Sequence, residues 1–450
     1  MTPTPPLPAA GQPGEPQGLP QGRVIVLGAG VAGLLAALAL QARGLAVTVV
    51  DTTPPGDDAA APPPEPVHRL PAALWLDPPA WLAGLGEALR AQGVGPGVLQ
   101  LCSVEGCARE RWPLLPDKAS LHAALGSLLQ ARPGVQRWRL PRLRLQWAGG
   151  LWQLSEAAEV VDGPPAAPTG LLQAAALVDA SGGRRALQTA LLAACGDAGA
   201  LELSGERQRY RSFTLAAPAP AAAGLWLLRD RQAQTWLVHQ AASGRLSVTE
   251  RLHGPEAGAD AAAGPGTAST AALLARLLAA ATCWRQKTLL QVLARAEPAG
   301  APALYRAPPA RRWQLPEAVL AGRLPCCAVG DALVQTPPWL GQGVAQAALH
   351  AHTLATLPAA AGWPGQAAAV LDGTAAGQLQ AAALAAWAET LAETETHPLT
   401  TETSDAPSFP PSLRRHPGAG RPGARARPTA AAARRPVGEQ LHAKDQRRPR

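Results

Sequence analysis

The apolar positions of the chain fall into short runs, and the length and spacing of each run predict its element. Residues 23–27 and 46–50 are apolar, β-branched runs of strand length. Residues 31–43 are apolar on nearly every side and are followed by Gly44, which predicts a buried helix that ends at a glycine cap. These three segments therefore predict a strand–helix–strand unit with parallel strands.

Later segments repeat this alternation of strands and helices, and a run of antiparallel strands interrupts it. Apolar strands are predicted at 171–178 and 324–329, and helices at 117–130, 185–195, 343–354 and 375–393. Short strands are also predicted between residues 138 and 161. Antiparallel strands are predicted at 207–215, 225–228, 235–240 and 245–252, before a helix over 270–296. In the first of these strands the alternation places Tyr210, Ser212 and Thr214 on one face.

This order predicts an α/β fold in which a Rossmann-type domain contains an inserted domain made of an antiparallel sheet and helices. The expected boundaries are a disordered leader at 1–22, the first part of the Rossmann-type domain at 23–200, the inserted substrate domain at 201–316, the second part with its C-terminal helices at 317–395, and a disordered basic tail at 396–450.

Charge and composition narrow the range of partners. The formal net charge is +8, but residues 411–450 hold ten arginines and one lysine against Glu439 and Asp445, so the remainder is close to neutral. This basic segment is poor in core-forming residues, which favours a solvated tail over a nucleic-acid-binding surface. We therefore expect no specific nucleic-acid partner, and the sequence leaves the oligomeric state open.

Compartment and metal content follow from the cysteines and the apolar runs. The six cysteines have no spacing typical of a zinc or redox site, and no metal is expected. Residues 24–40 are uncharged, but the glycines in their first half favour a strand, a turn and a helix over a transmembrane segment. No signal peptide is recognised in residues 1–22, so we expect a cytoplasmic protein.

The strongest chemical motif joins the first strand to the first helix. It reads Gly28-Ala29-Gly30-Val31-Ala32-Gly33, and Asp51 ends the second strand. In such a turn the first glycine permits the tight bend, the second lets backbone approach a pyrophosphate, and the third allows close packing of helix and strand. The helix N-terminus stabilises the phosphates, and Asp51 can accept hydrogen bonds from a ribose. This pattern predicts a dinucleotide site without separating NAD from FAD.

Two further motifs follow apolar strands. Asp179-Ala180-Ser181-Gly182 is by itself more typical of a plain turn. Gly330-Asp331-Ala332 is followed by Pro338-Trp339-Leu340-Gly341-Gln342-Gly343 at the start of a helix. An aspartate at a strand end can bind polyol hydroxyls, and a glycine-rich helix start offers free N–H groups that would stabilise a reduced flavin.

The order of these three motifs resembles the FAD-dependent monooxygenase superfamily built on the para-hydroxybenzoate hydroxylase fold, nearest to its branch of uncharacterised oxidoreductases and polyketide epoxidases. The resemblance covers roughly residues 23 to 390. It implies that FAD is bound by residues of all three motifs and by Lys118, which stands where that family usually has an arginine near the phosphates. The implied cofactor-binding residues are Gly28, Ala29, Gly30, Gly33, Asp51, Lys118, Asp179, Gly330, Asp331, Pro338, Gly341, Gln342 and Gly343.

Several positions depart from the family pattern. Thr336, Pro337 and Leu340 replace polar and aromatic residues of the related branch, and Asp179 is followed by Ala180 where many hydroxylases have glycine. The Asp-Gly pair helps those enzymes to bind NADPH, so the choice of NADPH or NADH stays open. His68 falls where the related branch has histidines near its substrate, although a surface role is more common for a single loop histidine. His122 is expected to be structural.

The resemblance implies an FAD-dependent enzyme that inserts one oxygen atom of O2 into an aromatic or polyene substrate through a flavin hydroperoxide, with NADPH or NADH as reductant. No catalytic residue is identified. The substrate would lie over residues 207–253, between the flavin and the inserted sheet. The alternatives are an FAD-dependent dehydrogenase or reductase without oxygen insertion, and a catalytically impaired flavin-binding protein. A halogenase is less favoured because no W-x-W-x-I-P run occurs.

Overall fold

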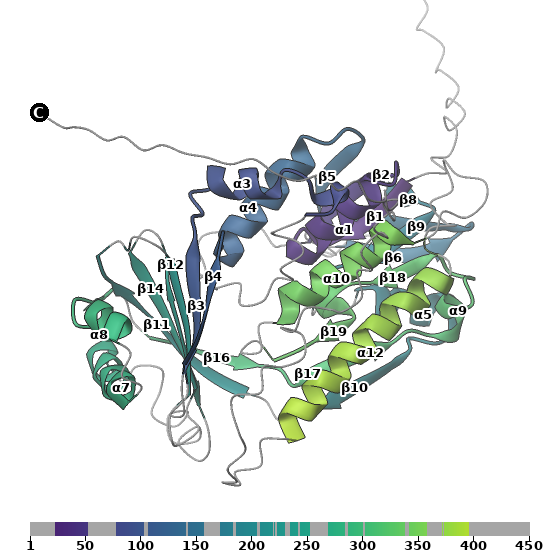
Figure 1. The fold of residues 1–450 in the computed structure, drawn as a ribbon. Coiled ribbons are helices and arrows are strands. Elements are labelled where there is room, and N and C mark those ends of the chain that lie inside the picture. Colours follow the sequence, from purple (N-terminus) through teal and green to yellow (C-terminus); the bar gives the residue numbers. More distant parts are fainter. Residues whose placement is uncertain are drawn as a thin grey trace, which may run out of the picture. The chain divides into compact units, whose positions relative to one another are not determined.

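Figure 1 shows the computed structural model of the protein. The structure describes residues 23–52, 78–102, 107–140, 143–156, 172–182, 186–204, 208–218, 220, 223–229, 235–241, 244–252, 269–283, 287–299, 302–337, 342–357, 371 and 373–395. The expected leader and tail lie outside these residues, as do His68, Pro338 and Gly341.

A five-stranded parallel sheet forms the centre of the first domain. Its strand order is β18 (Cys326–Ala328), β9 (Ala176–Asp179), β1 (Arg23–Leu27), β2 (Ala46–Asp51) and β5 (Val135–Arg139). The interior of β1 is fully buried, as expected of a strand covered on both faces. The chain passes from β1 to β2 on one side, whereas the later strands β9 and β18 lie on the other side. The strand order therefore reverses at β1.

Helices cover one face of this sheet, where α1 (Val31–Gln41) packs against both α4 (Lys118–Gln130) and α10 (Gln342–Thr356) (Figure 1). Also packed on this domain are α3 (Leu85–Ala91), α5 (Ala186–Cys195), α9 (Glu317–Leu320), α12 (Gly373–Glu395) and the 3-10 helix η2 (Ala80–Leu82).

A small antiparallel sheet packs near β1 and β9. It consists of β6 (Leu143–Ala148), β7 (Leu151–Glu156) and β8 (Leu172–Ala174). Trp152 of β7 is fully buried, and its Nε1 donates a hydrogen bond to the carbonyl oxygen of Pro325 at 2.9 Å. This contact ties the small sheet to the residue just before β18.

The second domain is built on an eight-stranded sheet. Its strands are β15 (Glu297–Pro298), β16 (Ala303–Ala307), β11 (Gln208–Ala216), β14 (Arg245–Leu252), β13 (Thr235–Gln240), β12 (Ala223–Arg229), β3 (Gly97–Cys102) and β4 (Cys107–Trp112). Helices α7 (Thr270–Cys283) and α8 (Lys287–Leu293) share a core with one face of this sheet. Among the side chains in that core are Phe213, Trp236, Val238, Leu277 and Leu289.

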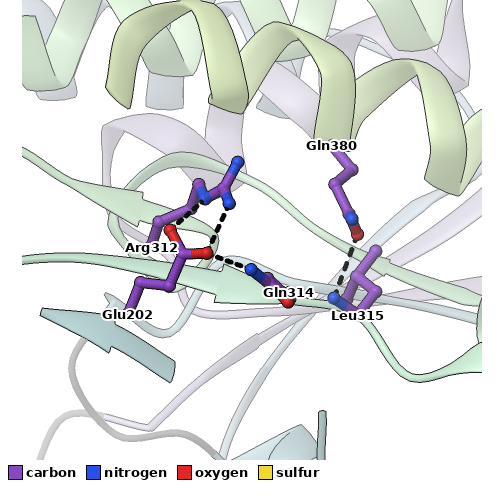
Figure 2. Close-up of polar contacts among 5 residues, drawn as sticks. All are labelled: Glu202, Arg312, Gln314, Leu315 and Gln380. Carbon is purple, nitrogen blue, oxygen red and sulfur yellow. Dashed lines mark hydrogen bonds and ion pairs between the residues drawn. The ribbon is translucent and has the colours of Figure 1, made fainter. Parts of the chain in front are cut away.

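A fourth sheet is formed by segments that join the two domains along the chain, and it includes the strand that follows the late motif. It contains β10 (Ala200–Ser204), β17 (Ala310–Gln314) and β19 (Val334–Gln335), which directly follows the short helix η4 (Gly330–Ala332). Figure 2 shows Arg312 of β17 paired with Glu202 of β10, at 3.0 Å from Nε to Oε2 and 2.7 Å from Nη2 to Oε1. Gln314 also donates to Glu202, and Gln380 of α12 accepts from the backbone N–H of Leu315 at 3.0 Å.

Three sequence expectations differ from the structure. The apolar run expected as one strand at residues 171–178 forms two strands, β8 and β9, which belong to different sheets. Strands β3 and β4 lie within the segment expected to belong to the first domain, yet they extend the eight-stranded sheet because β3 pairs in parallel with β12. The helix expected over residues 270–296 is two helices, α7 and α8. The expected α/β architecture, with its parallel Rossmann-type sheet and a separate sheet covered by helices, is confirmed, although this second sheet is mostly and not wholly antiparallel.

Candidate cofactor-binding site

The loops that follow three neighbouring parallel strands meet at one edge of the five-stranded sheet. Gly28 follows β1, Ala180 follows β9 and Val329 follows β18, and backbone hydrogen bonds join Ala180 N to Leu27 O at 2.8 Å and Val329 N to Asp179 O at 2.9 Å. In open parallel sheets, ligands bind beyond the carboxyl ends of the strands at the point where the strand order reverses. The three sequence motifs therefore converge where such a fold binds its ligand.

The glycines of the first motif differ in their steric surroundings. Gly28 has a φ of +98°, and a Cβ there would lie 2.5 Å from the carbonyl oxygen of Ala180. A Cβ on Gly33 would lie 1.9 Å from the carbonyl oxygen of Gly28. Gly30 is exposed, and a Cβ on it would meet nothing within 4 Å. Gly28 and Gly33 are thus needed for packing, whereas Gly30 borders open space.

The start of α1 is suited to an anion. Gly30 is its N-cap and makes no side-chain capping hydrogen bond, and the first turn contains no acidic residue. Uncapped N–H groups at a helix N-terminus carry partial positive charge and stabilise phosphate groups. A pyrophosphate beside Gly30 would fit both this charge and the open space.

Two residues of α4 extend this part of the site. The Nε2 atom of His122 lies 2.7 Å from the carbonyl oxygen of Ala29, so this imidazole contacts the glycine-rich turn directly. The sequence offered no signal for this contact, which depends on the packing of α4 against α1. Lys118 is exposed in the first turn of α4, where Asp117 caps the helix by accepting from Ser120 N at 2.7 Å.

The carboxylates of the first and second motifs have different surroundings. Asp51 is half-buried at the end of β2, next to the turn, since Gly28 N donates to Val50 O at 2.8 Å. Asp179 is buried, and its Oδ1 accepts from the backbone N–H and the hydroxyl of Ser181 at 2.9 and 2.6 Å. Burial raises the pKa of Asp179, and the hydrogen bonds from Ser181 oppose this shift. Asp179 therefore closes its own turn, whereas Asp51 lies half-buried at the edge of the sheet.

The third motif is positioned from several sides. Gly330 has a φ of +57°, and a Cβ there would lie 2.7 Å from the Cβ of Ala32 in α1. Asp331 is exposed, and its Cβ lies 3.9 Å from the position that a Cβ on Gly182 would take. Its Oδ1 lies 3.5 Å from the corresponding position on Gly343. The structure thus places the Asp331 carboxylate between the second motif and the start of α10, where Gln342 is buried.

His350 of α10 was missed by the sequence analysis. Its imidazole is fully buried, and Nδ1 accepts a hydrogen bond from the backbone N–H of Gly330 at 2.9 Å. Burial lowers the pKa of His350 to about 4. The apolar spacing of α10 could have indicated that position 350 faces the core, but no sequence pattern pointed to its partner in another element.

The sheet of the second domain presents a hydroxyl-rich face opposite its helices. The register pairs Ser212 with Thr249 and Thr214 with Ser247, and the Ser212 and Thr249 hydroxyl oxygens are 3.0 Å apart. His239 pairs with Ser247 on the same face. Burial lowers the pKa of His239 to about 4, and the charge of Asp117 partly opposes this shift.

Taken along the edge of the sheet, the exposed or half-buried groups are Asp51, Gly30, Lys118 and Asp331. In order of strand position they are a carboxylate after β2, an exposed glycine after β1 with a lysine in the first turn of α4, and a carboxylate two strands away after β18. This arrangement is extended along the sheet edge and fits a dinucleotide such as FAD. Among the described residues, no group of His, Cys, Asp or Glu side chains could hold a metal ion, and no helix could span a membrane.

Comparison with known proteins agrees with this geometry. Residues 23–61 match the family model of the FAD-binding domain, which spans the glycine-rich turn and Asp51. A search of the curated proteins found no match to this sequence.

Solved structures of flavoproteins share the fold. A flavoprotein/dehydrogenase from Cytophaga hutchinsonii is 16% identical with a TM-score of 0.53, covering 74% of this chain and 76% of its own. The flavin-dependent halogenase CmlS is 14% identical with a TM-score of 0.58, covering 82% of this chain and 62% of its own. CtdE, solved in complex with FAD, is 15% identical with a TM-score of 0.52, covering 84% of this chain and 93% of its own. The chain therefore has the fold of FAD-dependent oxidoreductases, as the sequence resemblance implied.

Proposed function

We propose that this protein is an FAD-dependent oxidoreductase that acts as a monooxygenase on a small organic substrate. The observation that carries the proposal is the convergence of three motifs at the switch point of the parallel sheet, with Gly30 open to an anion and Asp331 exposed two strands away. One edge thereby offers separate acceptors and an anion site for the two halves of a dinucleotide.

In this proposal each motif serves one part of FAD. Gly28, Gly30 and Gly33 form the pyrophosphate turn, Asp51 binds the adenosine ribose, and Lys118 neutralises phosphate charge. Gly330 and Asp331 bind the ribityl chain, and the start of α10 lies beside the flavin ring. The residues proposed there are Pro338, Gly341, Gln342 and Gly343, of which the first two lie outside the described residues.

The chemistry that FAD supplies when bound is the oxidation of NADPH or NADH and the activation of O2. The chain itself would bind the substrate, orient it and exclude water. The proposed substrate surface is the hydroxyl-rich face of the eight-stranded sheet, because α7 and α8 occupy the opposite face. Hydroxyl groups such as those of Ser212 and Thr249 can both donate and accept, which suits an oxygenated substrate.

The decisive experiment follows flavin reduction and the fate of oxygen in the full-length protein. We expect a yellow protein that releases FAD, not FMN, on denaturation, and whose colour is bleached anaerobically by NADPH or NADH. With 18O2 and a panel of aromatic and polyene substrates, a monooxygenase incorporates one 18O atom into its product. Gly30→Glu, which places a charged side chain in the pyrophosphate space, provides the flavin-free control.

The other outcomes are equally specific. Substrate oxidation without incorporation of 18O would show a dehydrogenase or reductase instead. Bound FAD that neither nicotinamide reduces, with or without substrate, would show a flavin-binding protein without this activity. A protein that takes up no FAD would contradict the proposal as a whole.

A further inference from the structure

A buried histidine supports the turn that would bind the ribityl chain. Nδ1 of His350 accepts a hydrogen bond from the backbone N–H of Gly330 at 2.9 Å, and the imidazole is fully buried. Gly330 directly precedes Asp331, the exposed carboxylate of the third motif. The contact joins two elements, η4 and α10, that both border the proposed flavin site.

The direction of this hydrogen bond determines the chemical state of the ring. A backbone N–H can only donate, so Nδ1 must be an acceptor and carry no proton. The imidazole is therefore neutral, and its proton resides on Nε2, which has no hydrogen-bond partner among the described residues. A protonated ring would place a second N–H against that of Gly330 and lose the bond.

Gly330 is also held by close packing on its other side. Its φ of +57° is a left-handed conformation that residues with a side chain rarely adopt, and a Cβ would lie 2.7 Å from the Cβ of Ala32. The His350 bond satisfies the amide of a residue confined in this way. Asp331 follows in the same short helix, so the position of Gly330 determines where the Asp331 carboxylate points.

We propose that His350 is a positioning residue for FAD: its neutral imidazole anchors the Gly330 amide and thereby orients the Asp331 carboxylate toward the ribityl chain. This inference rests on the FAD binding proposed above. It predicts that loss of the imidazole weakens the flavin half of the site, whereas the ADP half at Gly28, Gly30 and Asp51 keeps its affinity.

Two substitutions of His350 distinguish the effect of its hydrogen bond to Gly330 from the effect of its packing in the core. His350→Asn places an amide oxygen near the position of Nδ1 and can keep the acceptor, whereas His350→Leu fills the space without one. His352→Leu, at an exposed position of the same helix, controls for helix propensity. Binding of FAD and of ADP to each apoprotein is measured by calorimetry, together with the melting temperature of each apoprotein.

We expect His350→Leu to weaken FAD about tenfold and to leave ADP affinity within about twofold of the unmodified protein. His350→Asn should recover FAD affinity to within about threefold, and His352→Leu should match the unmodified protein. Equal losses of FAD and ADP affinity in His350→Leu would overturn the inference, since they would indicate general destabilisation. An unchanged FAD affinity in His350→Leu would also overturn the inference. In either case, FAD binding by the unmodified protein would still support the proposed function.

A measurement on the unmodified protein covers the case in which His350→Leu does not fold. Histidine labelled with 15N should show, in long-range 1H–15N spectra, that the His350 ring remains neutral with its proton on Nε2 when the exposed histidines are protonated; the buried ring of His239 should give a second neutral signal. The His350→Asn variant assigns the His350 signal by its loss. Observation of the opposite tautomer, with the proton on Nδ1, would exclude the hydrogen bond from Gly330 and the inference with it.

Discussion

The Nε2 atom of His122 lies 2.7 Å from the carbonyl oxygen of Ala29, so a side chain of α4 contacts the second residue of the glycine-rich turn. A carbonyl oxygen only accepts, so Nε2 of His122 must donate. His350 has the opposite role toward Gly330, where its Nδ1 accepts. Two histidines thus support two turns of the proposed FAD site, and protonation breaks only the second of these hydrogen bonds.

The glycines of the first motif should respond differently to substitution. Gly33→Ala would place a Cβ 1.9 Å from the carbonyl oxygen of Gly28, so we expect a loss of stability of ~1–3 kcal/mol and a displaced turn. Gly30→Ala meets no atom within 4 Å and should leave the melting temperature of the apoprotein almost unchanged while weakening FAD. Thermal unfolding and flavin content measure the two effects.

Gly377→Ala is the matched control for these variants, because it adds a methyl group to an α-helix in open space. It should raise stability by ~0.5–1 kcal/mol through helix propensity alone. If Gly30→Ala destabilised the apoprotein as much as Gly33→Ala, the assignment of Gly30 to the ligand rather than to packing would be wrong.

Asp331→Ala tests the polyol end of the site. Charge-assisted hydrogen bonds to a carboxylate contribute ~1.5–3 kcal/mol, so the affinity for FAD should fall roughly tenfold to a hundredfold. Affinity for ADP should not change, because Asp331 lies two strands from β1 and the pyrophosphate turn. Parallel titrations of the variant with FAD and with ADP measure the two affinities. An equal loss of affinity for both ligands would argue against the placement of the flavin half of FAD at Asp331.

Acid should destabilise the fold through its buried histidines. Burial lowers the pKa of His239 and of His350 to about 4 from an ordinary value of 6.5. As the pH falls below 6.5 the unfolded chain takes up protons at these positions, whereas the folded protein does so only near pH 4. The folded protein therefore has its full stability above pH 6.5. As the pH falls from 6.5 to about 4, each buried histidine should lower the free energy of unfolding by up to ~3 kcal/mol.

Urea unfolding of the apoprotein at several pH values between 7.5 and 4.5 measures this loss. Other titrating groups contribute to the same curve, so the test is the difference between the unmodified protein and the His350→Asn and His239→Gln variants. Each variant should flatten the pH dependence in this range. A slope unaffected by either substitution would show that these imidazoles are not buried in neutral form.

The second domain contains a buried ion pair that should matter for stability. Glu250 is fully buried, lies 3.7 Å from Arg211, and contacts Arg276, which stacks over the ring of Trp236. Glu250→Gln keeps the shape but removes the charge that compensates buried Arg211, so we expect a loss of ~3–5 kcal/mol. Glu202→Gln is the comparison: its partner Arg312 is as buried as Arg211, but the carboxylate of Glu202 is 34% exposed, so water screens this pair and its loss should be smaller than that of Glu250.

Chemical denaturation measures both ion-pair variants. The free energy of unfolding should fall much more for Glu250→Gln than for Glu202→Gln, while the FAD affinity of the folded fraction remains unchanged in both. Similar losses in the two variants would indicate that Glu250 is better solvated than its burial suggests.

Much of the first domain was predictable because its signals are local. The turn from β1 to α1 needs Gly28, Gly30 and Gly33 at fixed spacing, and the adjoining strands are short apolar runs. The strands Thr235–Gln240 and Arg245–Leu252 have the bounds that their alternation predicts. The identity of the cofactor-binding edge follows from these patterns, since carboxyl ends of parallel strands lie together.

Contacts between distant segments could not be predicted from the sequence. The apolar pattern at residues 97–112 does not predict whether β3 pairs with β2 or with β12, because a strand offers the same backbone groups to any neighbour. Nor does it pair His350 with Gly330, twenty residues earlier in another element. The sequence by itself determined the turn chemistry and the order of the motifs, because φ, glycine spacing and strand length are local properties. Only the tertiary structure decided which strands are neighbours and which side chains support each turn, because those choices depend on how α1, α4 and α10 pack together.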